Sequence, residues 1–193
     1  MTLVRFLGCL SVLIGPSCSP KSSGAPEAEL GGMSTGSHAP ASGGGGLTAS
    51  SDSPCTDPGL VWKTANKTYY ESYPDPGSEE CIAYNGCTWE GQFAACNGKK
   101  PEAWVEARNI ASAFPDFGAL RLHDLCLRKG EKTLVVTVLD TCADSDCDGC
   151  CTKNRGTAEQ LIDLESYTNA RWGVPDGRIE WADLGPTHGA GCD

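Results

Sequence analysis

Apolar and polar positions alternate in three parts of the chain and predict β-strands there. The tyrosine-rich segment KTYYESY (67–73) has the composition and spacing of a strand. Alternating leucines from Leu120 to Leu127 lead to the turn KGEK and then to the apolar run Leu134 to Leu139, which predicts a hairpin. The segment DGRIEWADL (176–184) predicts a last short strand.

Helical spacing occurs in two further segments. In EAWVEARNIASAF (102–114) an apolar residue recurs every three or four positions, which predicts a helix. The second half of 158–173 has the same periodicity and ends at Gly173, a residue suited to a helix C-cap. Because strands outnumber helices, the pattern favours a mainly β protein, a small β-barrel with one or two short helices.

The N-terminus has the order of features found in secretory signal peptides. Within residues 1–17, Arg5 precedes an apolar run and then small residues, and the run is too short to cross a bilayer. The end of this leader, IGPSC, resembles the lipobox of bacterial lipoproteins, which predicts lipidation at Cys18. Plain cleavage or an uncut leader remains the alternative. We therefore expect a secreted protein or an outer-membrane or cell-surface lipoprotein.

The composition changes sharply after the leader. Residues 18–54 are rich in Gly, Ser, Pro and Ala and have almost no apolar bulk, so we expect a disordered linker. Residues 55–193 contain the predicted strands and helices and form the single expected domain. Twelve cysteines in 193 residues indicate a disulfide-stabilised protein outside the reducing cytosol.

The net charge limits the possible partners. At −10, it argues against nucleic acid and anionic lipid, which both require basic protein surfaces. A neutral polymer or a small ligand is compatible with this charge. We expect a monomer that contacts a membrane only through the N-terminal lipid anchor.

The segment TVLDTCADSDCDGCC (137–151) places aspartates and cysteines directly behind a β-branched run. Its spacing imitates the start of a calcium-binding EF-hand loop, but Arg155 stands where a bidentate Glu is required. Cys147 and Cys150 have a zinc-like spacing, yet zinc would also require Cys142 and Cys151 as thiolates. Disulfides are the favoured interpretation, with no metal and no cofactor, and spacing does not fix their pairing.

Several of these segments together resemble a known family. VVTVLDTC, the cysteine-rich loop, LIDLESYTNARWG and PDGRIEWADL occur in the order found in the double-psi β-barrel of expansins, barwin-like proteins, family 45 glycoside hydrolases and rare lipoprotein A. CLRKGEKTLVVTVLDTC is also similar to the barwin hairpin. The resemblance covers roughly residues 66–184 and implies a six-stranded, disulfide-stapled double-psi β-barrel.

The resemblance also implies site residues. Asp140 matches the aspartate that ends the central strand, and Asp163 matches the aspartate tied to wall loosening in expansins and to general-acid catalysis in the hydrolases. Both are therefore catalytic candidates. Thr68 and Tyr70 match the opening of the first strand and are substrate-binding candidates.

The sequence departs from the family pattern at two positions. Ser72 stands where the hydrolases have their catalytic base, and Glu165 replaces the usual serine after Asp163 and Leu164. Rare lipoprotein A also has an important histidine before this strand, and His123 is the candidate for it here, although an exposed strand residue is the simpler interpretation. Asp163 could instead cap the following helix.

Aromatic side chains bind sugars by stacking on the apolar faces of pyranose rings. Tyr70, chosen by family position, and Trp89, from a turn-rich loop, are the candidates for an exposed platform, with burial in the core as the alternative.

Three functions remain open. The first is a non-hydrolytic, expansin-like module that binds or loosens cell-wall polysaccharide. The second is a lytic transglycosylase or glycoside hydrolase acting on peptidoglycan or β-glucan. The third is a barwin-like scaffold that binds or inhibits proteins. The missing base favours the first function over the second.

Overall fold

The computed structural model describes residues 53–188 and 191–193, which belong almost entirely to the expected domain. The predicted signal peptide, Cys18 and all but the end of the predicted linker lie outside the described residues. Within the described part, no helix has the length and apolar character needed to cross a membrane.

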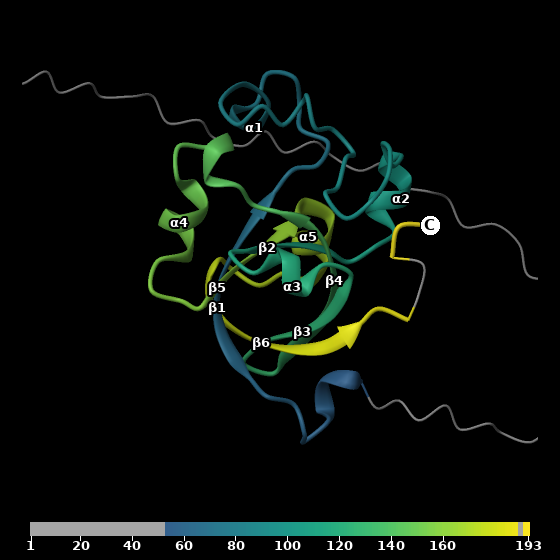
Figure 1. The fold of residues 1–193 in the computed structure, drawn as a ribbon, viewed down its shortest axis with the longest axis vertical. Coiled ribbons are helices and arrows are strands. Elements are labelled where there is room, and N and C mark those ends of the chain that lie inside the picture. Colours follow the sequence, from purple (N-terminus) through teal and green to yellow (C-terminus); the bar gives the residue numbers. More distant parts are fainter. Residues whose placement is uncertain (1–52, 189–190) are drawn as a thin grey trace, which may run out of the picture. The chain divides into compact units, whose positions relative to one another are not determined.

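Six strands close into a barrel (Figure 1). Around the barrel, the neighbouring strands follow the order β1-β5-β2-β4-β3-β6. Their bounds are β1 (Lys63–Tyr70), β2 (Ile110–Phe114), β3 (His123–Lys129), β4 (Lys132–Thr141), β5 (Gln160–Glu165) and β6 (Gly177–Pro186).

The strand pairing has an internal symmetry. β1 pairs with β5 in parallel, as β2 does with β4, and the other four pairs are antiparallel. If β1 is exchanged with β4, β2 with β5 and β3 with β6, the same pairs of neighbouring strands result, with the same parallel or antiparallel directions. The barrel therefore consists of two interlocked halves of three strands each. This topology is that of a double-psi β-barrel and confirms the fold predicted from the sequence.

The predicted hairpin and last strand are both present. β3 and β4 pair from Lys129 and Lys132 outward, and Gly130 in the turn adopts a φ of 60°, which favours glycine. β6 closes the barrel between β3 and β1.

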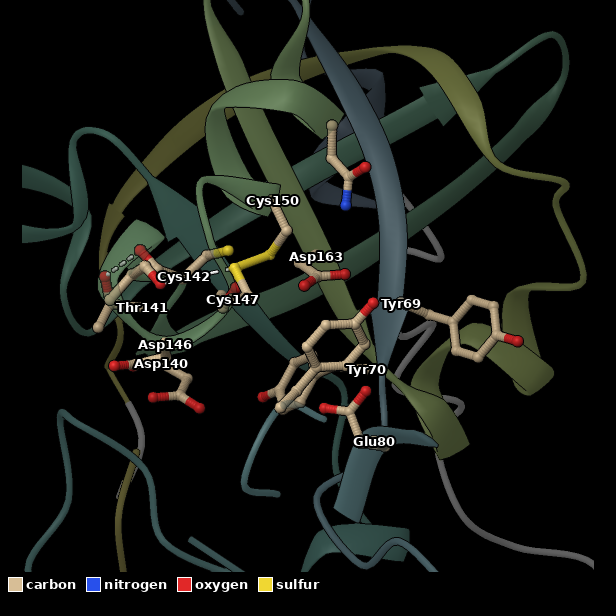
Figure 2. A pocket seen from close by; sticks show the side chains of 14 residues that line it. Tyr69, Tyr70, Glu80, Asp140, Thr141, Cys142, Asp146, Cys147, Cys150 and Asp163 are labelled. Carbon is tan, nitrogen blue, oxygen red and sulfur yellow. Dashed lines mark hydrogen bonds between the residues drawn. A yellow bond between two sulfur atoms is a disulfide. The ribbon is translucent and has the colours of Figure 1, made fainter. Parts of the chain in front are cut away.

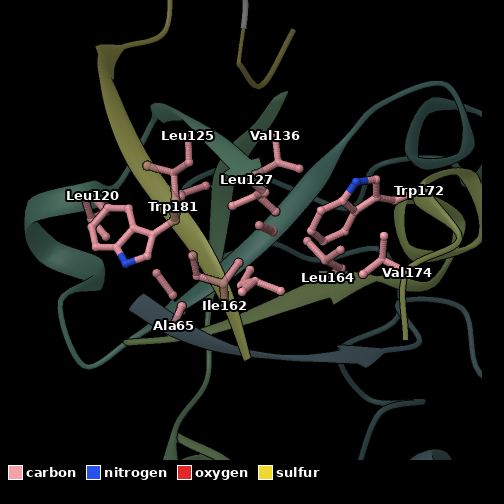
Figure 3. Packing of buried hydrophobic residues seen from close by; sticks show 14 residues of the cluster. Ala65, Leu120, Leu125, Leu127, Val136, Ile162, Leu164, Trp172, Val174 and Trp181 are labelled. Atoms are coloured by element: carbon pink, nitrogen blue, oxygen red, sulfur yellow. The ribbon is translucent and has the colours of Figure 1, made fainter. Parts of the chain in front are cut away.

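The interior of the barrel holds an apolar core (Figure 3). Trp172 and Trp181 are 5% and 2% exposed and pack with aliphatic side chains from the strands. One lysine also lies inside: Lys67 is 1% exposed, and its Nζ donates to the Val174 carbonyl at 3.0 Å and to Asp176 at 2.7 Å. These partners offset the cost of burying the charge.

The helix predicted over 102–114 is wrong in its second half. Only Glu102–Glu106 is helical, as α2, while Ile110–Phe114 forms strand β2. β2 lies between β4 and β5, and its first four residues are buried. Its sequence therefore lacks the alternation of apolar and polar residues that marks a half-buried strand. Pairing with two strands outweighs its local helical spacing.

The helices are short and outnumber the one or two expected. The described residues contain five α-helices: α1 (Glu79–Ile82), α2, α3 (Phe117–Leu120), α4 (Cys150–Arg155) and α5 (Ser166–Trp172). The predicted C-cap of α5 is confirmed, since Gly173 is left-handed with a φ of 60° and its N–H bonds to the Asn169 carbonyl.

Disulfides tie the loops to the barrel, as the cysteine count predicted. All ten cysteines of the described residues are paired: Cys55–Cys126, Cys81–Cys87, Cys96–Cys192, Cys142–Cys151 and Cys147–Cys150. Two of these bridges staple the segment between β4 and α4, and one staples the loop that contains α1.

Candidate functional site

Four polar residues form a row across neighbouring strands. In the strand register, Ser112 of β2 lies opposite Asp140 of β4 on one side and opposite Asp163 of β5 on the other. Asp163 in turn lies opposite Thr68 of β1. Since residues in register are the nearest cross-strand neighbours, the barrel brings together Asp140 and Asp163, which are 23 positions apart in the sequence.

Ser112, Asp140 and Asp163 line a groove of about 220 Å³, and Figure 2 shows the two aspartates in it. One wall is the stapled segment after β4, which includes the Cys147–Cys150 disulfide, and Glu80 and Tyr84 contribute from the region of α1. An adjoining hollow of about 370 Å³ shares Glu80 and the tyrosines of β1 and reaches Thr68. The two hollows also share Asn154, and together they are termed the groove.

Asp163 is a carboxylic acid held partly in its neutral form. The Thr68 hydroxyl donates to its Oδ1 at 2.8 Å. The side chain can be reached from the groove, yet dense protein surroundings weaken its hydration, and this burial raises its pKa to about 7. The negative charges of Glu80 and Asp140 add to the increase, while the Thr68 hydrogen bond opposes it.

Asp140 is the more acidic of the two groups. Burial raises its pKa to about 6, opposed by hydrogen bonds from the backbone N–H groups of Ala94, at 3.0 Å, and Thr141. Both carboxyls are therefore less fully ionised near neutral pH than exposed aspartates are. Such a pair can supply both a proton donor and a charged acceptor for sugar hydroxyls.

Tyr70 lines the groove but is largely enclosed. Its hydroxyl is buried and lies close enough to Asp140 for each group to influence the pKa of the other. Burial raises the pKa of Tyr70 well above its ordinary value, and the nearby carboxylates, Asp140 first among them, raise it further. Tyr70 thus lies inside the groove and does not form the exposed platform suggested by its family position.

The exposed aromatic residues are different ones. Tyr69 and Tyr84 line the groove and are 51% and 39% exposed. Trp89 is 55% exposed, as expected, but lines neither hollow. The side chains available for stacking inside the groove are therefore Tyr69 and Tyr84.

The two residues that depart from the family pattern contact each other. The Ser72 hydroxyl donates to Glu165 Oε1 at 3.0 Å, and both side chains are buried. Glu165 also accepts hydrogen bonds from the Ser166 hydroxyl and the Tyr167 N–H, and it is the N-cap of α5. Glu165 therefore caps this helix, whereas Asp163 lies in β5 and does not cap it.

Glu80, Tyr84 and Ser112 line the groove but are not among the site residues predicted from the sequence. Burial raises the pKa of Glu80, and the charges of Glu71 and Glu79 add to this. None of the three follows a recognisable motif, because the α1 loop and the pairing of β2 determine where they lie. His123 lies outside the groove, where its Nδ1 contacts Asp183 at 2.9 Å.

Comparisons with known proteins give limited similarity. No protein-family model matches the sequence, and no curated protein matches it. Several solved structures are similar at low identity, and two of them are described here. An expansin from Clavibacter michiganensis is 15% identical with a TM-score of 0.38, over 67% of this chain and 53% of that one. The Streptomyces papain inhibitor is 17% identical with a TM-score of 0.35, over 64% of this chain and 94% of that one.

The chain spans about half the length of the expansin. Because both TM-scores are low, the assignment to the double-psi β-barrel class rests on the strand order and pairing described above. Within that class, the chain is a disulfide-stapled barrel with an acidic groove.

Proposed function

We propose that this protein binds a cell-wall polysaccharide in the groove and acts as a non-hydrolytic, expansin-like module. The row formed by Asp140, Ser112, Asp163 and Thr68 carries this proposal, since it lines the floor of an open groove with polar groups. Tyr69 and Tyr84 add exposed rings on which sugar units can stack.

The charge of the groove limits the kind of polymer. None of the described residues that line either hollow is a lysine, arginine or histidine. The acidic residues that line them are Glu71, Glu79, Glu80, Asp140, Asp146, Asp163 and Asp176. An anionic polysaccharide would be repelled here. The proposed ligand is therefore a neutral polymer such as cellulose or chitin, or the glycan strand of peptidoglycan.

The proposed setting is outside the cytosol. Five disulfides in one small domain are typical of extracytoplasmic proteins. We further propose that the N-terminal leader directs secretion and that Cys18 carries a lipid anchor. The linker over 18–54 would then hold the barrel away from the membrane.

Bond cleavage is the second candidate function, and Glu80 is the observation that favours it. Ser72 is buried against Glu165 and cannot act as a base, but Glu80 lines the groove and interacts electrostatically with Asp163. Asp163 could donate a proton to the leaving oxygen while Glu80 activates water or a sugar hydroxyl.

A binding and product assay tests the proposal. The purified full chain is incubated with cellulose, chitin and peptidoglycan, and both bound protein and released sugars are measured. We expect the wild type to bind at least one of these polymers and Asp163→Asn and Asp140→Asn to bind at least tenfold more weakly. Release of sugars that Glu80→Gln abolishes would instead support the cleavage function.

Glu131→Gln is the matched control. Glu131 is exposed in the hairpin turn at the opposite end of β4 from Asp140, so this variant should bind like the wild type. Full binding by a correctly folded Asp163→Asn protein would contradict the groove as the site. Binding to a protein partner with none to the polymers would favour the barwin-like alternative.

A further inference from the structure

Among the described residues that line the groove, Asn154 is the only one with an amide side chain. It belongs to α4 and lines both the hollow of about 220 Å³ and the hollow of about 370 Å³. The other polar side chains along the described lining carry carboxyl or hydroxyl groups, so Asn154 alone offers side-chain N–H donors there. Its side chain is exposed, and within the described part of the chain no hydrogen bond to its amide is found. The amide is therefore available to a ligand in the groove.

A series of contacts connects Asn154 to Asp163. Asn66 Nδ2 donates to the Asn154 carbonyl at 2.7 Å, which attaches the end of α4 to β1. Asn66 and Thr68 lie on the same face of β1, because they are two positions apart in a strand. The Thr68 hydroxyl donates to Asp163 Oδ1 at 2.8 Å, and no described residue donates to Oδ2. An amide donor and a carboxyl acceptor are thus held beside the same face of β1.

An apolar surface adjoins the amide on α4. Cys150 and Asn154 are four positions apart in α4 and are therefore neighbours on one face of the helix. Cys150 is bonded to Cys147, whose Sγ lies 3.7 Å from the Ala143 carbonyl oxygen. Cys147, Cys150 and Ala143 all line the hollow of about 220 Å³ (Figure 2). The intact disulfide and the Ala143 methyl group together suit a small apolar group of a ligand.

We propose that these groups form a subsite for the acetamido group of a 2-acetamido sugar, an inference that rests on the proposed binding of a polysaccharide in the groove. An acetamido group consists of an N–H donor, a carbonyl acceptor and a methyl group. Asp163 accepts a hydrogen bond from the N–H, the Asn154 amide donates to the carbonyl, and the methyl group packs on the Cys147–Cys150 disulfide and Ala143. The ligand is then a polymer of N-acetylated amino sugars, and Asn154 determines this specificity.

Cellulose lacks the matching group. It carries a hydroxyl at the sugar C2 position, which cannot reach both Asp163 and Asn154 and has no methyl group to bury. Tyr69 also lines both hollows and is 51% exposed, so a sugar ring can stack on it at this point. The equatorial substituents of a stacked ring point sideways, toward the walls of the groove. A site that hydrogen-bonds one substituent discriminates against an analogue that lacks it.

Titration calorimetry with soluble oligosaccharides tests the subsite. The full chain is titrated with a chitin oligomer and with a cellulose oligomer of equal length. We expect the wild type to bind the chitin oligomer about tenfold more tightly. Asn154→Asp keeps the size of the side chain but removes its N–H donors. It should weaken binding of the chitin oligomer about tenfold and leave binding of the cellulose oligomer nearly unchanged.

Asn97→Asp is the matched control, since Asn97 is exposed, lines neither hollow and undergoes the same change of charge. This variant should bind both oligomers like the wild type. Equal affinity of the wild type for the two oligomers, or a preference that a folded Asn154→Asp protein retains, would overturn the acetamido subsite while leaving the groove as a polysaccharide site. Binding of neither oligomer would overturn the proposed function and the subsite with it.

Discussion

Asp163 and Asp140 show how surroundings set the chemistry of individual residues. Both are ordinary aspartates in the sequence, but burial at the floor of the groove raises their pKa values to about 7 and about 6. Among the described residues, no basic side chain contributes to lowering either pKa value. Their ionised forms are thus disfavoured in the folded protein, and this has a consequence for its stability.

We predict that Asp163 makes the protein less stable as the pH rises. The raised pKa means that the folded chain binds this proton more tightly than the unfolded chain, so its stabilising contribution is complete below about pH 4 and is lost as the pH passes 7. Asp163→Asn removes the effect while keeping an acceptor for Thr68. From pH 4 to pH 8, the unfolding free energy of the wild type should fall by on the order of 3 kcal/mol relative to the variant.

Urea denaturation across this pH range measures the difference. Relative to Asp140→Asn, the unfolding free energy of the wild type should fall by less, and the fall should be complete at a lower pH, because the pKa of Asp140 is raised less. A difference between wild type and Asp163→Asn that does not change with pH would show that Asp163 is not held in its neutral form.

At the scale of elements, the junction between β5 and α5 holds two carboxylates with different surroundings. Asp163 and Glu165 are two positions apart in β5, yet Asp163 lines the groove and Glu165 is fully buried, with three hydrogen bonds to its carboxylate. The replacement of a serine by Glu165 thus provides a helix cap and a partner for Ser72. The cost of removing it should appear in stability.

We predict that Glu165→Ala destabilises the protein by about 2 to 4 kcal/mol. The substitution removes the cap of α5 and leaves the buried Ser72 hydroxyl without its acceptor. Chemical denaturation measures the loss, and polysaccharide binding below the unfolding transition should stay close to that of the wild type.

Ser78→Ala is a suitable comparison, because Ser78 caps α1 through a single bond to the Cys81 N–H in a less buried position. Its loss should cost about 1 kcal/mol or less. If Glu165→Ala were no more destabilising than Ser78→Ala, the buried hydrogen bonds of Glu165 would contribute little.

At the scale of the whole molecule, disulfides and the closed barrel share the task of holding the loops. The Cys55–Cys126 bridge joins residues 71 positions apart and ties the segment before β1 to β3. The Cys81–Cys87 bridge spans only 6 positions and shapes the loop that carries Glu80 and Tyr84. The two bridges should therefore contribute to different properties.

We predict that the long-range bridge matters more for stability and the short one more for binding. From loop-closure entropy, Cys55→Ala with Cys126→Ala should cost about 4 to 5 kcal/mol, and Cys81→Ala with Cys87→Ala about 2 kcal/mol. The second double variant should nevertheless bind polysaccharide more weakly, since it frees one wall of the groove. Melting curves and binding assays on both variants check this, and equal stability losses would contradict the loop-length argument.

Local patterns in the sequence determined much of this fold. The hairpin around Gly130, the last strand, the end of α5 at Gly173 and the presence of disulfides follow from turn chemistry, alternation and cysteine count, which act within a few residues or through composition. Asp140 and Asp163 were identified as candidates through a resemblance in the order of segments.

Only the tertiary structure decided which residues share the groove. β2 has a helical spacing but becomes a strand because β4 and β5 bind both of its edges, and this pairing places Ser112 between the two aspartates. Glu80 and Tyr84 reach the groove from a loop, and Glu165, next but one to Asp163, is turned into the interior. Contacts between residues far apart in the chain made these choices, and a pattern read over neighbouring positions does not contain them.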